Sequence, residues 1–174
     1  MTTKFDPNNA QNAIEVLHRF AVKAVEHAQT YWNLLEKVPP RNLKLTKLDD
    51  DIFEHTMRDF PELAENDHEK VTKLDEDWMK SKDGKERWRK FIQAYEKTVK
   101  DYNFGSLIRT DAREEYGEKN TIFGAHVKFY AFEIARNRLG LNDQAHELAK
   151  QEAEKERMKE ARDKEKGKKR TNGK

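Results

Sequence analysis

The chain has 174 residues, of which 39% are charged and 35% hydrophobic, so its hydrophobic core must be small for its length. It contains no cysteine, which excludes disulfide frameworks and thiolate metal sites. No apolar run approaches the roughly 18 residues of a membrane span and no secretory signal is visible, so we expect a cytoplasmic protein that binds no membrane.

A first helix is predicted from Asn8 or Asn9, which can cap it, to Val38, just before two prolines. Its apolar positions keep the three-to-four spacing of one helix face; they are Ile14, Leu17, Ala21, Ala24, Ala28, Tyr31 and Leu35. A helix of about 28 residues is roughly 40 Å long. We therefore expect it to pack along the whole bundle.

A second helix is predicted over Lys47–Asp59, with Thr46 and Asp49 spaced as a capping box and Pro61 beyond its end. Residues 49–77 carry 12 acidic and 3 basic side chains, the strongest charge asymmetry in the chain. Such a stretch is either a solvated face or a docking surface for a basic partner. Both interpretations stay open.

A single helical turn is predicted near Asp75–Met79, followed by a third long helix over Lys85–Tyr102. Gly105, just past that helix, could take the left-handed conformation that ends it. Residues 106–110 could form a short extended segment.

The central helix is predicted over Ile122–Leu139 and ends at Gly140. It contains the most apolar run of the chain, residues 122–134, which indicates a segment buried on most of its circumference. We expect an all-α fold, an orthogonal bundle of three long helices with shorter pieces.

Composition changes abruptly at the C-terminus, where fifteen of the residues 151–170 are charged. Such a segment buries too little surface to offset its ordering entropy, although its charges permit a solvated helix. We therefore divide the chain into a helical domain, residues 1–143, and a charged tail, residues 144–174, that is mobile or transiently helical.

Little in the sequence points to catalysis. The six histidines show no metal-ligand spacing, and no glycine-rich phosphate loop is present. Asp49 and Asp51 form an Asp-x-Asp pair, but residues two apart on a helix point about 200° from each other and cannot hold one ion. We expect no catalytic residue, no metal and no cofactor.

Several polar residues crowd the apolar segment between Asp101 and Arg138, among them Arg109, Asp111, Arg136 and Asn137. An unpaired charge beside a core is costly. The set is either a group of caps and ion pairs that fix the turns or a recognition surface on rigid elements.

These same residues carry a family resemblance. The segments DYNFGSLIRTD, YGEKNTIF and FEIARNR, with VEHAQTYWNLL, NLKLTKLDDDIFE and MKSKDGKERWRKF before them, form one collinear block over roughly residues 20–140. The block is similar to the polysaccharide-biosynthesis-domain-containing protein 1 family and its fungal homologues.

The resemblance implies a small, mainly helical, cytosolic chaperone dedicated to newly made translation elongation factor 1-alpha. Such a protein would engage the GTPase domain of that client at the ribosome, together with a ribosome-associated J-domain protein. GTP would belong to the client.

We place the client contact, as a hypothesis, on Asp49, Asp50, Asp51 and Glu54 and on Arg109, Asp111, Arg136 and Asn137. We expect a monomer without sequence-specific nucleic-acid binding. Two alternatives stay open: a glycan-modifying enzyme, as the family name suggests, and a ribosome or RNA adaptor that acts through the basic tail.

Overall fold

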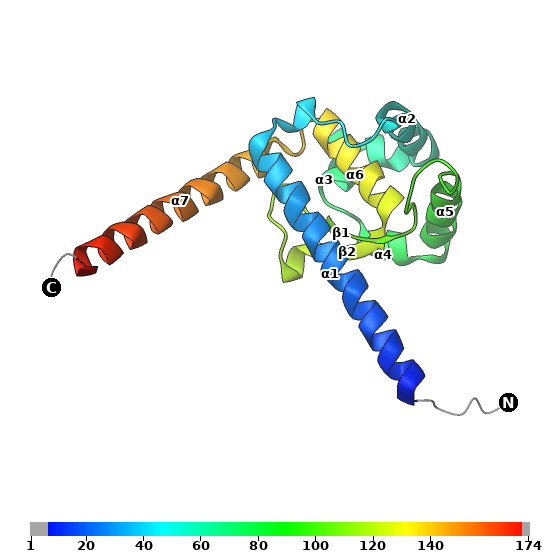
Figure 1. The fold of residues 1–174 in the computed structure, drawn as a ribbon. Helices are drawn as coiled ribbons and strands as arrows, with labels where there is room; N and C mark the ends of the chain where they lie inside the picture. The colour runs from blue at the N-terminus through cyan, green and yellow to red at the C-terminus, as the bar shows by residue number, and fades with distance from the viewer. Residues whose placement is uncertain (1–6, 172–174) are drawn as a thin grey trace.

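The computed structural model describes residues 7–171, and side chains from residue 11 to residue 169. Its helices of five or more residues are α1 (Pro7–Lys37), α2 (Asp49–Asp59), α4 (Glu76–Lys80), α5 (Lys82–Gln93), α6 (His126–Arg138) and α7 (Asp143–Thr171). Shorter helical turns are η1 (Pro40–Asn42), η2 (Pro61–Ala64), η3 (Asn66–His68), α3 (Glu69–Thr72) and η4 (Glu118–Asn120). Figure 1 shows α1 and α7 as two long arms on a body built around α6.

The body contains a two-stranded antiparallel sheet, β1 (Gly105–Arg109) with β2 (Thr121–Ala125), in which Leu107 pairs with Phe123. The all-α fold class was therefore wrong, because the chain is mostly helical with a small sheet. The expected extended segment near residues 106–110 is confirmed as β1.

The sheet explains why the central helix is shorter than predicted. Residues 121–125 pair with β1 and α6 begins only at His126. Local apolar density cannot distinguish a buried strand from a buried helix; the pairing partner decides. Gly140 has φ +75°, and the backbone N–H of Leu141 donates to the Arg136 carbonyl at 2.9 Å, so the predicted end of the helix is confirmed as a Schellman turn.

The third predicted helix is also shorter than expected. Helix α5 ends at Gln93, and hydrogen-bonded turns continue to Asn103, with Tyr95 and Val99 still buried. Asp101, not Gly105, takes the left-handed conformation, with φ 57°, and Gly105 begins β1. Aspartate tolerates this conformation because its short side chain can hydrogen-bond locally.

The predicted turn near residues 75–79 is present as α4, and it meets α5 at a sharp corner. The Ser81 side chain caps α5 by accepting from the Gly84 N–H at 3.1 Å. A Cβ on Gly84 would lie 2.1 Å from the carbonyl oxygen of Trp78. Glycine at this position lets the two helices approach.

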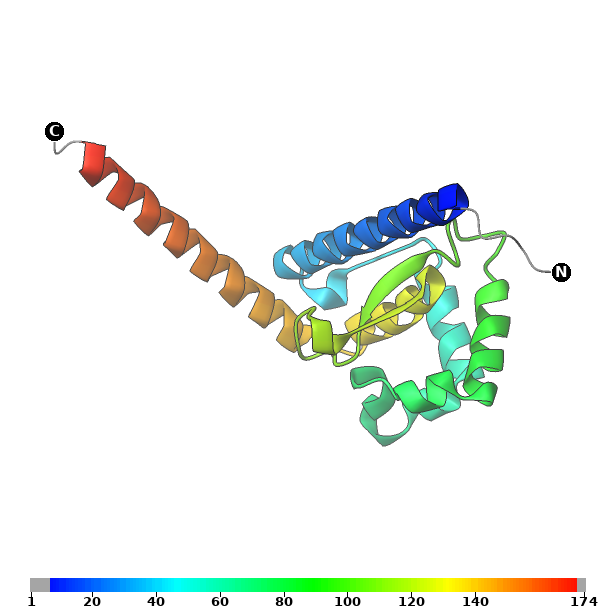
Figure 2. The ribbon, with the colours of Figure 1, turned by 90° about the horizontal axis from the view of Figure 1, so that it is seen from below.

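The core lies between α6 and the elements around it. Phe129, Phe132 and Ile134 are at most 2% exposed, and residues 131–137 of α6 are all buried. Helix α6 is thus buried on most of its circumference, as expected. Figure 2 shows α1 and the sheet on one side of α6 and the helices α2 to α5 on the other.

The C-terminal segment of the described chain is one continuous helix, α7. Ala145 and Ala149 of α7 are buried at 0% and 1% exposure, and the His146 ring bonds the Leu35 carbonyl at 2.5 Å. From Glu154 to Lys169 every side chain is exposed. The division of the chain at residue 143 stays a prediction.

Candidate functional site

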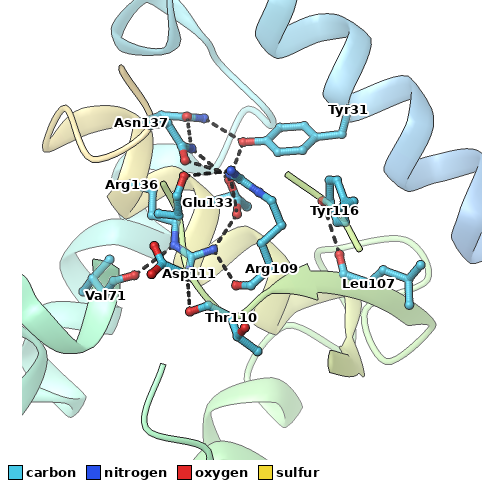
Figure 3. Close-up of polar contacts among 12 residues, drawn as sticks. Tyr31, Val71, Leu107, Arg109, Thr110, Asp111, Tyr116, Glu133, Arg136 and Asn137 are labelled. Carbon is cyan, nitrogen blue, oxygen red and sulfur yellow. Dashed lines mark hydrogen bonds and ion pairs between the residues drawn. The ribbon is translucent and has the colours of Figure 1, made fainter. Parts of the chain in front are cut away.

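The carboxylate of Glu133 on α6 is fully buried, at 0% exposure. It accepts from Arg109 on β1 at 3.1 Å, from Arg136 on α6 at 2.9 Å and from the Tyr31 hydroxyl on α1 at 2.6 Å (Figure 3). Asn142, just before α7, donates to it at 2.9 Å. One carboxylate therefore ties together both long helices, the sheet and the central helix.

Opposing effects act on the Glu133 pKa. Burial alone would raise it, but the charges of Arg109 and Arg136 and the hydrogen bonds from Tyr31 and Asn142 outweigh burial and lower the pKa to about 2. Glu133 is consequently ionised at any ordinary pH. All of the hydrogen-bond donors to Glu133 are side chains of this chain. The network therefore stabilises the fold.

Four of the predicted contact residues belong to this interior. Arg109 and Arg136 are 0% exposed, Asn137 2% and Asp111 9%. Arg136 also donates to the Val71 carbonyl at 2.9 Å. Groups this deeply buried present no surface to a partner of the folded chain, so we assign them structural roles.

The four predicted client contacts on the acidic helix α2 differ in their surroundings. Asp49 is buried and accepts from the backbone N–H groups of Leu45 at 2.9 Å and Thr46 at 2.7 Å, so it fixes the start of the helix. Asp50 pairs with Arg138, which lowers the Asp50 pKa. Asp51 and Glu54 are exposed and make no ion pair with any described residue, so they remain free to meet a partner.

The first half of α1 is exposed. Residues 11–23, which we call the projecting half of α1, are exposed at every position. Ile14 and Leu17 are each 67% exposed, although the same helix face buries Tyr31 and Leu35 further along. The expectation that this helix packs along the whole bundle was wrong, because the body ends before the helix does (Figure 1).

An acidic cleft of about 320 Å³ lies where α1 and α7 diverge. Four carboxylates line it: Glu36, Glu115, Glu152 and Glu156. Its aromatic wall is formed by Trp32 and Tyr116, whose ring centroids are 6.2 Å apart. The Trp32 indole N–H donates to Glu152 at 3.3 Å.

The carboxylates of the cleft crowd one another. Burial, then the hydrogen bond and charge of Glu115, raise the pKa of Glu152 to about 7. Arg157 pairs with Glu36 at 3.1 Å, whereas Glu115, Glu152 and Glu156 make no ion pair with a described residue. Because Glu115 and Glu152 are hydrogen-bonded and the pKa of Glu152 is about 7, that pair does not carry two full negative charges at neutral pH. The Trp32 and Tyr116 rings already have the buried Arg109 guanidinium 5.6 Å and 5.7 Å from their centroids, so the carboxylates at the rim are the groups left to attract a cationic side chain.

The cleft and the projecting half of α1 adjoin each other. Val25 lines the cleft and is 59% exposed, so apolar surface runs from the arm to the acidic rim. Sequence reasoning missed Glu115 and Glu152, because one lies in a loop and the other in the supposed tail. Trp32, in the segment VEHAQTYWNLL, could have indicated a binding site. Its acidic partners, however, are 83 and 120 positions away in the sequence.

No helix within the described residues, 7–171, is long and apolar enough to cross a bilayer. No group of three or more histidine or carboxylate side chains in the same range is arranged to hold a metal ion.

Comparisons with known proteins agree with the resemblance stated above. The family described as PBDC1 protein matches residues 16–147. Proteins named Protein PBDC1 homolog are similar: that of Saccharomyces cerevisiae is 52% identical over 80% of this chain and 94% of its own, and that of Schizosaccharomyces pombe is 52% identical over 82% and 96%. The solution NMR structure of a Saccharomyces cerevisiae protein, 50% identical, covers 82% of this chain and 96% of its own with a TM-score of 0.71.

Proposed function

Because this chain belongs to the PBDC1 family, we propose that it is a non-enzymatic chaperone for the nascent GTPase domain of translation elongation factor 1-alpha. In this proposal it acts in the cytoplasm, on ribosomes, with a J-domain protein as partner. GTP binds to the client and completes the folding of the client. The chaperone supplies only a binding surface.

The observation that carries the proposal is the continuity of exposed apolar and acidic surface on α1. Soluble proteins rarely leave a contiguous apolar patch uncovered unless it serves binding. Ile14, Leu17 and Val25 are 59–67% exposed along one arm. A client that has not finished folding exposes apolar segments for which this arm offers a partner.

The acidic groups add selectivity. A basic client segment would be attracted to the cleft at Glu115 and Glu152, since complementary charge raises the encounter rate and disfavours acidic competitors. Asp51 and Glu54 on α2 supply further unpaired negative charge. Of the eight residues first proposed as contacts, these two are retained.

The test is capture of nascent chains. Ribosome-bound complexes are purified with the tagged full-length chain, and the nascent chains are identified. We expect one dominant chain, elongation factor 1-alpha, held after its GTPase domain begins to emerge. No enriched nascent chain would overturn the proposal.

A variant pair locates the contact. Ile14→Asn with Leu17→Asn removes the apolar arm and should abolish capture. Met158→Asn, a matched change at an apolar residue 61% exposed on α7, should leave capture unchanged. Equal capture by both variants would remove the arm from the proposal.

The RNA adaptor remains a second candidate because α7 extends its exposed cations away from the body (Figure 2). Lys164, Lys166 and Lys168 lie on that exposed end. Removal of residues 160–174 separates the two candidates: loss of ribosome association would favour the adaptor, and unchanged capture would favour the chaperone.

A further inference from the structure

A second pocket, of about 410 Å³, lies at the opposite end of the molecule, between α4, α5 and the start of α6. Its apolar walls include Met79, Ile92 and Tyr102. Its charged residues are Lys85, Arg89 and Lys128, and no described carboxylate lines it. We call it the Trp88 pocket after the aromatic residue that also lines it.

Trp88 carries a buried donor without an acceptor. Its side chain is 2% exposed, and within the described residues its Nε1–H has no hydrogen-bond partner. The ring is held in place because Phe60 stacks on it at 4.1 Å. A buried unsatisfied donor is costly, and in a native structure it often marks a place for a ligand or water.

Lys128 adds a cation over the face of the Trp88 ring. Its Nζ lies 5.1 Å from the centroid of the Trp88 ring, and it makes no ion pair with a described residue. Burial lowers its pKa to about 8, which no neighbouring carboxylate counteracts. An anion would supply the missing charge.

The cations of α5 differ from one side of the helix to the other. Arg87 pairs with Glu62 at 2.7 Å and Lys90 with Glu86 at 3.6 Å. Lys85 and Arg89, four residues apart, face the pocket and pair with no described carboxylate. Two cations of α5 that line the pocket are therefore left without a described counter-charge.

We propose that the Trp88 pocket binds a carboxylate side chain of an acidic segment in a partner protein. The carboxylate accepts from the Trp88 indole N–H and pairs with Lys128, while apolar neighbours in the segment pack on Ile92 and Tyr102. The apolar walls favour a peptide over a free inorganic anion, because a hydrated anion gains nothing from them.

This interaction does not depend on the proposed chaperone function. The Trp88 pocket is basic and lies beside α5, whereas the cleft at α7 is acidic and lies at the other end of the body (Figures 1 and 2). A basic client segment and an acidic partner segment can accordingly occupy the chain together.

The test uses the full-length chain and two fluorescein-labelled pentapeptides, acidic Asp-Leu-Asp-Leu-Asp and neutral Asn-Leu-Asn-Leu-Asn, titrated by fluorescence anisotropy. We expect the acidic peptide to bind at least about tenfold more tightly. Lys128→Met and Trp88→Phe should each weaken it about tenfold. The controls Lys90→Met and Trp78→Phe, which alter the same residue types outside the pocket, should leave the affinity unchanged.

NMR of the chain with acidic peptide provides a readout that does not depend on the variants folding. The Trp88 Nε1–H resonance should move downfield on saturation, while that of Trp32 stays in place. Equal affinity for the neutral peptide, no effect of Lys128→Met, or full displacement of the peptide by equimolar inorganic phosphate would each overturn the proposal.

Discussion

Glu133 shows how one buried charge can organise a chain with a small core. A carboxylate in an apolar interior is expensive unless donors surround it. Arg109, Arg136, Tyr31 and Asn142 supply those donors from four separate segments. Breaking one partner of such a network leaves uncompensated buried charge, so these segments are held together at one point.

Glu133→Gln should destabilise the fold by about 3–5 kcal/mol, because it leaves two buried guanidinium groups without a counter-charge. Urea unfolding measures the change. Asp50→Asn is the control: it breaks an ion pair to Arg138 on the surface and should hardly move the midpoint. Equal shifts of the urea midpoint for the two variants would contradict the proposed role of Glu133 in stabilising the fold.

The same residue sets a pH dependence. The folded pKa of Glu133 lies at about 2, below its ordinary value of 4.5, so its contribution to stability is complete above pH 4.5 and is lost as pH falls toward 2. The difference in unfolding free energy between the native chain and Glu133→Gln should therefore narrow over that window. A constant difference from pH 5 to pH 2 would show that Glu133 is not the group that titrates.

Among the elements, α1 has the same three-to-four spacing of apolar residues in both halves, but only one half is buried. Ala24, Ala28, Tyr31 and Leu35 are buried, whereas Leu17 on the same face is not. The apolar spacing is alike in both halves, but only the second half has the sheet and α7 beside it.

Leu35→Ala should cost about 2–5 kcal/mol and Leu17→Ala no more than about 0.5 kcal/mol, because only the first creates a cavity. Urea unfolding of the two variants compares them directly. A large cost at Leu17 would mean that the arm packs on something in solution, such as a second copy, and analytical ultracentrifugation would identify it.

The close approach of α4 and α5 at Gly84 leads to a second prediction about an element of the fold. Gly84→Ala should destabilise the chain by about 1–3 kcal/mol despite the better helix propensity of alanine, since its Cβ would meet the Trp78 carbonyl. Gly117→Ala, at a site with nothing within 4 Å of the added Cβ, should be nearly neutral. Thermal unfolding would rank the pair, and the reverse order would contradict the close approach.

At the scale of the whole molecule, two arms leave a small body in different directions (Figure 1). They meet near Leu35 and His146, where α7 packs on α1. Beyond Glu154 the second arm is a solvated helix held by pairs such as Lys169 with Glu165 at 2.9 Å.

Removal of residues 160–174 should leave the unfolding midpoint unchanged and reduce helical circular dichroism. Removal of residues 144–174 should cost about 2–3 kcal/mol, from two buried methyl groups and a hydrogen bond. If both truncations unfold alike, the packing of Ala145 and Ala149 contributes nothing.

The sequence by itself determined the family, the first long helix, the end of α6 at Gly140 and the near-complete burial of α6. These features follow from local signals: collinear motifs, three-to-four spacing and a glycine free to take positive φ. Local signals also placed an extended segment at residues 106–110, but they could not supply its partner strand.

Only the tertiary structure decided which polar residues are internal and which are free. Arg136 and Asp51 both read as charged residues next to apolar ones, yet one is fully buried and the other exposed. Likewise Glu115 and Glu152 meet across 37 positions of sequence, and the Trp88 indole N–H has no acceptor among the described residues although Lys128 lies over its ring. Burial and pairing depend on groups distant in the chain, and no spacing within one segment encodes them.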